Sequence, residues 1–170
     1  MVILRATRKL QASLPPGPDS GQSDTALGDW YVNRLVVDRR PLLLLVSSHS
    51  LLPILIPARD VRSLPGRLPE VVAARLRRMG IDARAIAAET RAMAPVAVAK
   101  TVDRSVLGIL VEFGLTVPSH LEPGGWDETT LPFVEAQLAR TPCYATRRFE
   151  EVVFPESRAP ALLASRWLAG

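Results

Sequence analysis

The stretch that most constrains the fold is a continuous apolar run, Leu42 to Val46, with turn residues on either side. Runs of this length and composition are typical of a β-strand that is buried on both faces. The turn before it contains Pro41, and the turn after it is Ser47–Ser50. The sequence therefore predicts a buried strand over residues 42–46.

Further strands are expected around this run. Residues 30–37 alternate apolar and polar side chains, and residues 51–57 follow the serine-rich turn. Short links between these strands favour an antiparallel meander. Because Pro53 has no amide hydrogen to donate, the last strand of the meander is expected at a sheet edge or with a bulge. Two outlying strands, at 2–7 and 96–101, complete the expected sheet.

After residue 58 the apolar residues recur at helical spacing. The helices are expected at about 68–79, 83–93, 104–115 and 130–139. Gly80 is placed to end the first of them, and Asp82 and Asp103 are placed to cap the next two. Because strands come mostly first and helices mostly later, the predicted fold class is α+β: a small antiparallel sheet with helices packed on one face.

The length of 170 residues suits a single domain spanning 1–170. Residues 14–27 are rich in Pro, Gly and Ser and are expected to form a flexible loop. Signals fade in the C-terminal tail, 145–170, where a short helix over 161–168 is expected. No leader is visible and the longest apolar run is far shorter than a membrane helix, so we expect a soluble, cytoplasmic protein without membrane contact.

Charge is unevenly distributed along the chain, although the formal net charge is only +4. Residues 59–104 carry ten basic and five acidic side chains, whereas residues 105–140 carry one basic and five acidic. This asymmetry could steer an anionic partner to one face of the molecule. Alternatively, the two oppositely charged surfaces are solvated and meet each other.

Motifs for metals and cofactors are missing from the sequence. His49, His120 and Cys143 do not have the spacing of a zinc site, and no phosphate-binding glycine loop or dinucleotide fingerprint occurs. As the only cysteine, Cys143 cannot form an internal disulfide, and we expect it to be a small buried residue. A role as nucleophile would need a base brought close by the fold. We therefore expect neither a metal nor a cofactor.

Two polar stretches are the candidates for a site. Residues 100–105 lie between a predicted strand and a predicted helix, where free backbone N–H groups suit anion binding. Residues 28–33 combine two aromatic side chains with an acid and an amide. The alternatives are that the first stretch only caps a helix and that the second only begins a strand. The candidate polar site comprises Asp29, Trp30, Asn33, Lys100, Thr101, Asp103, Arg104 and Ser105.

Several short motifs resemble an uncharacterised family of bacteria and archaea that is catalogued only as a domain of unknown function. The motifs that carry the resemblance are Leu4–Leu10, Leu27–Asn33, Ser50–Pro53, Ala99–Gly108, Glu112–Phe113 and Thr141–Cys143. Together they span about residues 2–145, nearly the whole chain. The resemblance implies a bacterial protein in which the stretches 29–33 and 100–105 share one polar site, and it brings no activity, substrate or cofactor.

Two positions depart from the pattern of this family. Relatives often carry Cys where this chain has Ala6, and Asn where it has Val111. If either group were catalytic in the relatives, this protein would lack it.

Three functions fit these observations. The first is a non-enzymatic binding or regulatory module for RNA, DNA or a phosphorylated ligand, held through Arg5, Lys9, Lys100 and Arg104. The second is a small hydrolase or nuclease, with Asp29 or Asp103 as base, Arg104 stabilising an anionic transition state, and Ser105 or Thr101 positioning the substrate. The third is a structural subunit of a two-component complex, which an exposed apolar patch would favour.

Overall fold

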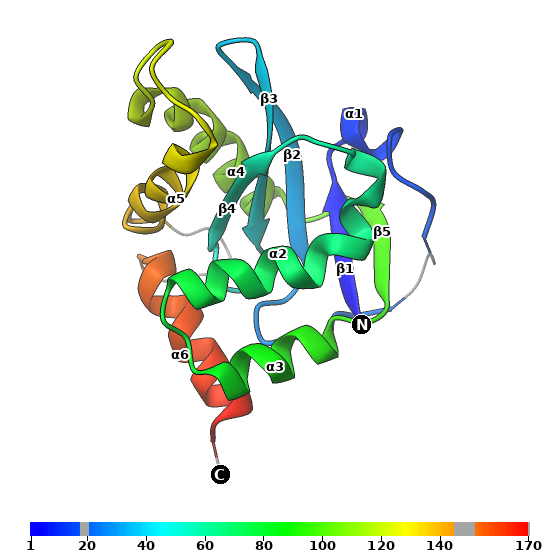
Figure 1. Ribbon diagram of the computed structural model, residues 1–170. Coiled ribbons are helices and arrows are strands. Elements are labelled where there is room, and N and C mark those ends of the chain that lie inside the picture. Colours follow the sequence, from blue (N-terminus) through cyan, green and yellow to red (C-terminus); the bar gives the residue numbers. More distant parts are fainter. Residues whose placement is uncertain (18–20, 145–151, 170) are drawn as a thin grey trace.

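The computed structural model describes residues 1–17, 21–144 and 152–169, and its centre is a five-stranded sheet between two helical layers (Figure 1). The strands are β1 (Val2–Ala6), β2 (Trp30–Val37), β3 (Arg40–Ser47), β4 (Pro53–Pro57) and β5 (Val96–Lys100). Their order across the sheet is β4-β3-β2-β1-β5. All five strands lie close to the ranges that the sequence predicts.

The sheet is mixed, so the prediction of an antiparallel sheet was wrong for two strands. β2, β3 and β4 form the expected antiparallel meander, whereas β1 pairs in parallel with both β2 and β5. Short links require antiparallel pairing only within the meander. The connections that lead into β2 and β5 are long and contain helices, and such connections allow parallel pairing.

The described helices match the predicted ones, with α6 longer than expected and α1 added. They are α1 (Arg8–Gln11), α2 (Leu64–Arg78), α3 (Ala83–Ala92), α4 (Arg104–Thr116), α5 (Leu131–Ala139) and α6 (Pro155–Trp167), with 3₁₀ turns η1 (Val61–Ser63), η2 (Val117–His120) and η3 (Glu128–Thr130). Gly80 follows α2 with φ +74°, a left-handed conformation that suits glycine after a helix. Asp82 and Asp103 accept hydrogen bonds from backbone N–H groups of α3 and α4, as predicted for N-caps.

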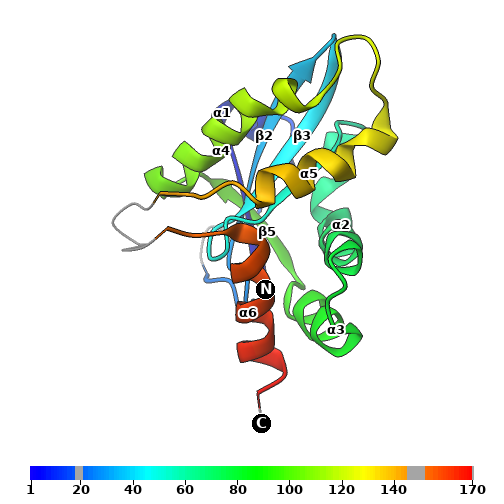
Figure 2. The same cartoon turned by 90° about the vertical axis from the view of Figure 1, so that its left-hand side faces the viewer.

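Helices cover both faces of the sheet, which corrects the prediction of one covered face (Figures 1 and 2). We call α2, α3 and α6 the α2 layer, and α4 and α5 the α4 layer. Side chains alternate along β2, so that Trp30 packs toward the α2 layer and Tyr31 toward the α4 layer. The apolar run 42–46 is buried throughout, as predicted, and a strand buried on both faces needs a helical layer on each side.

The sheet edge at β4 is closed by two charged side chains. Pro53 lies in this edge strand, as predicted from its missing N–H. Glu135 of α5 accepts a hydrogen bond from the backbone N of Leu55 at 2.8 Å, and Arg75 of α2 donates one to the carbonyl of Pro53 at 3.1 Å. An ion pair between the two layers therefore satisfies edge groups that would otherwise recruit another strand.

The C-terminal region contains a longer helix than the sequence predicts. α6 begins at Pro155 instead of near residue 161, and its Trp167 Nε1 donates to the carboxylate of Glu89 on α3 at 2.6 Å. Residues 145–151 of the predicted tail, and 18–20 of the predicted loop, lie outside the described residues. None of the helices in the described ranges is long and apolar enough to cross a membrane.

Candidate functional site

The candidate site lies where the two adjacent parallel strands β1 and β5 end. α1 leaves β1 toward the α2 layer, since its Leu10 belongs to that core, while α4 leaves β5 on the other face of the sheet. In open α/β sheets, ligands commonly bind outside the carboxyl ends of the strands, at the point where the connections go to opposite faces of the sheet.

Arg5 connects three parts of this region. Its Nε donates to Asp29 Oδ2 at 2.5 Å, and its Nη1 donates to the carbonyl of Lys100 at 3.0 Å. The side chains of Arg5 and Asp29 are only 15% and 19% exposed. Arg5 was predicted to bind an anion directly. Its charge is instead matched by a carboxylate, so Arg5 forms part of the support of the site.

Asp29 is held by several further groups. Its Oδ1 accepts a hydrogen bond from Ser23 Oγ at 2.6 Å, and its backbone N donates to Ser48 Oγ at 2.9 Å. Both carboxylate oxygens are therefore engaged. Ser48 belongs to the serine-rich segment 47–50, which the sequence predicts as a turn, and Ser23 lies in the predicted loop 14–27, so neither serine was among the predicted site residues.

Tyr31 joins the two predicted stretches, and the sequence did not identify it as a site residue. It is buried, and its hydroxyl accepts a hydrogen bond from the backbone N of Asp103 at 2.9 Å. Loss of water around this hydroxyl raises the pKa of Tyr31. Asp103 Oδ1 in turn accepts from the backbone N of Ser105 at 2.8 Å and of Val106 at 3.4 Å.

Trp30 does not join this cluster. It is fully buried on the opposite face of the sheet, in the core of the α2 layer. Its Nε1 is a buried donor without a hydrogen-bond partner among the described residues. Of two adjacent aromatic residues, the strand turns only Tyr31 toward the candidate site.

Asn33 and Thr101 lie at the same end of the sheet. Asn33 Oδ1 accepts a hydrogen bond from Thr7 Oγ1 at 2.9 Å and so ties β2 to the end of β1. Thr101 follows β5 in the link to α4 and is partly buried.

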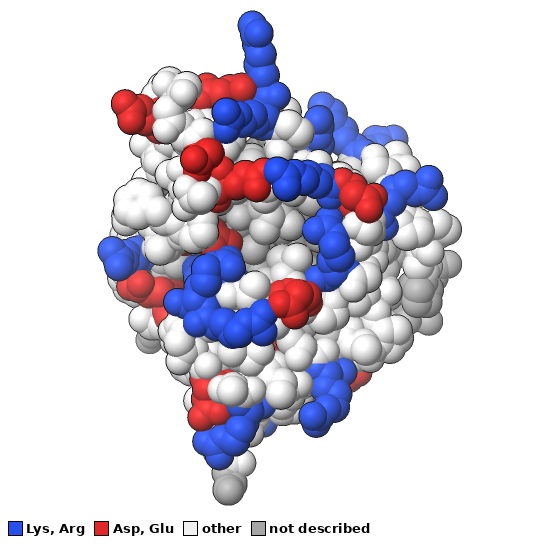
Figure 3. Space-filling view, viewed as in Figure 1, with Lys and Arg blue, Asp and Glu red and all other residues white. Residues whose placement is uncertain are grey.

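Basic side chains surround the carboxyl ends of β1 and β5, and Figure 3 shows them over the corner occupied by α1. We call Arg8, Lys9, Arg34 and Lys100 the basic rim. All four are exposed, and none forms an ion pair with a described residue. Arg104 is exposed as well, but it lies on the outer face of α4, one and two turns from Gly108 and Glu112.

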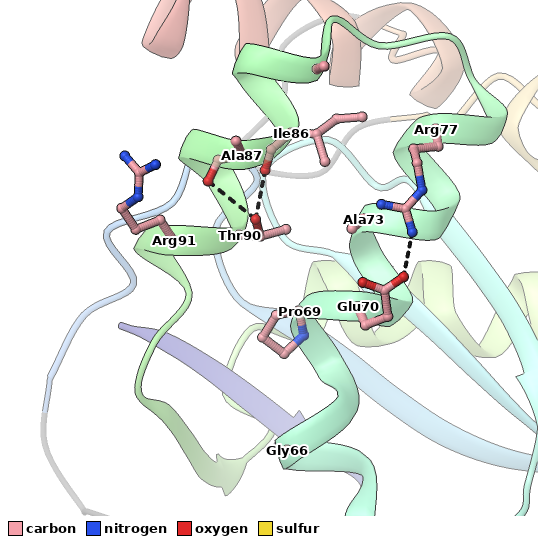
Figure 4. A pocket seen from close by; sticks show the side chains of 10 residues that line it. Gly66, Pro69, Glu70, Ala73, Arg77, Ile86, Ala87, Thr90 and Arg91 are labelled. Atoms are coloured by element: carbon pink, nitrogen blue, oxygen red, sulfur yellow. Dashed lines mark hydrogen bonds and ion pairs between the residues drawn. The ribbon is translucent and has the colours of Figure 1, made fainter.

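A larger hollow lies elsewhere, between α2 and α3, and has a volume of about 680 Å³ (Figure 4). Its floor is made of small and apolar side chains such as Ala73 and Ile86. Its one carboxylate, Glu70, is paired with Arg77, and the Thr90 hydroxyl donates to a backbone carbonyl of its own helix. Among the described residues that line this groove, the carboxylate and the hydroxyl therefore both have partners within the α2 layer.

Metal and thiol chemistry receive no support from the described residues. In the ranges 1–17, 21–144 and 152–169, no three His, Cys, Asp or Glu side chains gather as a metal site would require. Cys143 is buried, as predicted, and desolvation raises the pKa of its thiol to about 12. A thiol with that pKa stays protonated at neutral pH and is a poor nucleophile.

The fold and this site define an α+β protein with exposed basic side chains near the carboxyl ends of two parallel strands. Residues 3–158 match the model of a family described as a domain of unknown function, DUF6933, and the chain belongs to that family, as its motifs predict. No curated protein and no solved structure matched the chain.

Proposed function

We propose that this protein is a non-enzymatic binding module that holds a small phosphate-bearing ligand at the carboxyl ends of β1 and β5. The observation that carries the proposal is the basic rim. Four exposed cations without ion-pair partners in the described chain lie in α1, in β2 and at the end of β5. Clustered cations of this kind attract and hold phosphate groups.

The contacts below the rim favour binding by side chains over binding by a helix N-terminus. Asp103 already occupies the first free N–H groups of α4 and adds a negative charge there. Arg5 and Asp29 neutralise each other and fix the ends of the strands. The cations of the basic rim are therefore the groups left to contact a phosphate, and they include Lys9 of α1 and Lys100 at the end of β5.

A small ligand fits these residues better than a nucleic acid. Proteins that hold single strands stack bases on exposed aromatic side chains. Tyr31 and Trp30 are buried, and the exposed aromatic residues of the described chain, such as Phe133 and Tyr144, lie in or after α5. The net charge of +4 is also modest for a protein that binds long polyanions.

The same geometry favours a binding role over hydrolysis. A general base must be able to reach its target proton. Both oxygens of Asp29 and one oxygen of Asp103 already accept hydrogen bonds from the protein itself. The two carboxylates considered as bases are thus used to hold the fold.

Calorimetric titration with pyrophosphate and with a mixed set of nucleotides tests the proposal. We expect binding at low salt, weakened at least about tenfold in the double variant Lys9→Gln/Lys100→Gln, since each lost charge-assisted contact removes roughly 1.5–3 kcal/mol. The matched control is Arg39→Gln/Arg91→Gln, which removes two other exposed cations that form no ion pair with a described residue.

Three results would contradict the proposal. They are no binding by the unaltered protein, equal weakening by the control pair, and tight binding of mixed RNA with a steep salt dependence in place of nucleotides. The last result would indicate a nucleic-acid partner.

A further inference from the structure

The outer face of α4 exposes two large apolar side chains that no described residue covers. Val111 is 48% exposed and Leu115 is 78% exposed. The opposite face of the same helix is buried against the sheet through Val106, Leu110 and Phe113. A surface helix normally has one apolar stripe, so a helix with two is expected to have a second neighbour.

Large apolar side chains are exposed in α4, in α5 and in segments next to them, and α4 lies at the outside of the molecule in Figure 2. α2 and α3 expose no large apolar side chain. Cys143 and Val153 pack in the same core as α4. Their chain neighbours Tyr144 and Val152 are exposed. The exposed residues on this side are Val102, Val111, Leu115, Phe133, Tyr144 and Val152.

Gly108 lies at the middle of this outer face. It is exposed inside a helix, and a Cβ added there would meet no atom within 4 Å. Glycine destabilises a helix interior relative to alanine, and neither a turn nor internal packing requires it at this position. A close approach by the backbone of another molecule would account for it.

The charges on either side of Gly108 identify the other molecule. Arg104 lies one turn before Gly108 and Glu112 one turn after it, and neither forms an ion pair with a described residue. When two copies of α4 cross antiparallel at Gly108, Arg104 of each copy comes beside Glu112 of the other. A two-fold interface needs this kind of self-complementary surface.

We propose that the outer face of α4 is the interface between two copies of this chain, related by a two-fold axis near Gly108. Leu115 of each copy lies against the segment just before α4 of the other copy, which contains the exposed Val102, and two Arg104–Glu112 ion pairs flank the axis. The interface does not involve the basic rim, so it is independent of the proposed ligand site and goes beyond it.

Charge exchange tests this arrangement, with sedimentation equilibrium of the full chain as the measurement. We expect the unaltered chain to form dimers, and Arg104→Glu or Glu112→Arg alone to raise the dimer Kd about tenfold, since each replaces two ion pairs by two repulsions. The double variant Arg104→Glu/Glu112→Arg restores both pairs with reversed sign. Its Kd should return to within about threefold of the original value.

A second variant separates dimerisation from folding. Gly108→Gln places a longer side chain at the crossing and improves helix propensity, so it should abolish the dimer and leave the helical circular dichroism of the monomer intact. The control is Arg91→Glu, which reverses a charge on α3 and should leave the Kd unchanged.

A monomeric chain at every concentration would overturn the proposal. So would dimers that survive Gly108→Gln, or a double charge exchange that stays as weak as the single variants. Retained nucleotide binding by a monomeric chain would overturn only this inference and leave the proposed ligand site intact.

Discussion

Each helical layer buries one glutamate completely, and the two carboxylates are compensated in different ways. Glu135 of α5 accepts from Arg78 Nη2 at 2.8 Å and lies 3.9 Å from Arg75 Nε. Among the described residues, Glu89 of α3 accepts from uncharged donors alone, namely two backbone N–H groups and the indole of Trp167. A buried carboxylate is tolerated when enough donors converge on it, whether or not one of them is charged.

The two glutamates also differ in what they connect. Both arginines that pair with Glu135 come from α2, so this carboxylate joins the α4 layer to the α2 layer across the edge of the sheet. Glu89 acts within the α2 layer, where it fixes the backbone of Ala26 and Leu27 before β2 and holds the end of α6. An ion pair thus closes the sheet edge. A carboxylate held by uncharged donors anchors the loop before β2 and the terminal helix.

The largest effect is expected from Glu135→Leu. Burial already lowers the pKa of Arg75, and Glu135 is the group that counteracts this by stabilising its charge. Without it a cation is buried unpaired and Leu55 loses its acceptor, so the free energy of unfolding should fall by about 3–5 kcal/mol. Urea denaturation measures the change.

The double variant Arg75→Met/Glu135→Leu is the control for this loss. It removes both charges, and it should regain most of the stability if the unpaired cation is the cause. A double variant that is less stable than Glu135→Leu alone would show that the contact of Arg75 with the Pro53 carbonyl matters more than the ion pair.

A smaller loss is expected from Glu89→Gln, about 1.5–3 kcal/mol, since an amide turns an NH₂ group toward donors that need an acceptor. Urea denaturation again gives the free energy of unfolding. Glu70→Gln is the control, because Glu70 is exposed on the neighbouring α2 and should change stability little. An equal loss in the two variants would mean that the network around Glu89 adds nothing beyond a surface contact.

Local features of this fold could be predicted from the sequence, because each depends on a few neighbouring residues. The apolar run 42–46 identified a strand buried on both faces, and Asp82 and Asp103 identified two helix starts. Because Pro53 lacks an amide hydrogen, its strand was expected at an edge or with a bulge, and β4 is an edge strand.

Features that depend on distant parts of the chain could not be predicted. The parallel pairing of β1 depends on connections whose paths leave no local pattern. The Arg5–Asp29 pair joins β1 to the residue just before β2, and it depends on the register of the two strands, which no local pattern predicts. Tyr31 was missed for a related reason. The alternation of side chains along a strand predicts that Trp30 and Tyr31 face opposite sides of the sheet, but it does not predict which side holds the site.

The smallest effect concerns the tip of the β2–β3 hairpin. There the carboxylate of Asp38 contacts the loop between α4 and α5. Asp38 Oδ2 accepts from the backbone N of Gly124 at 2.9 Å and from Trp126 Nε1 at 2.7 Å. These two hydrogen bonds, the backbone one first, lower the pKa of Asp38 below its ordinary value of 3.8. A depressed pKa gives stability that is present above the ordinary value and is lost as the pH falls through the lowered one.

Asp38→Asn should therefore flatten the acid side of the stability profile, measured as the urea midpoint between neutral pH and pH values below 3.8. Asp60→Asn is a matched control, because Asp60 shares the left-handed backbone of Asp38, with φ 45° against 50°, and asparagine tolerates that conformation. The Asp60 side chain makes no hydrogen bond or ion pair to a described residue, so its variant should keep the acid slope of the original chain. If both variants lose the slope equally, the acid sensitivity comes from the general charge of the protein. The hairpin would then be held to Trp126 mainly by Arg40, which lies over the indole ring.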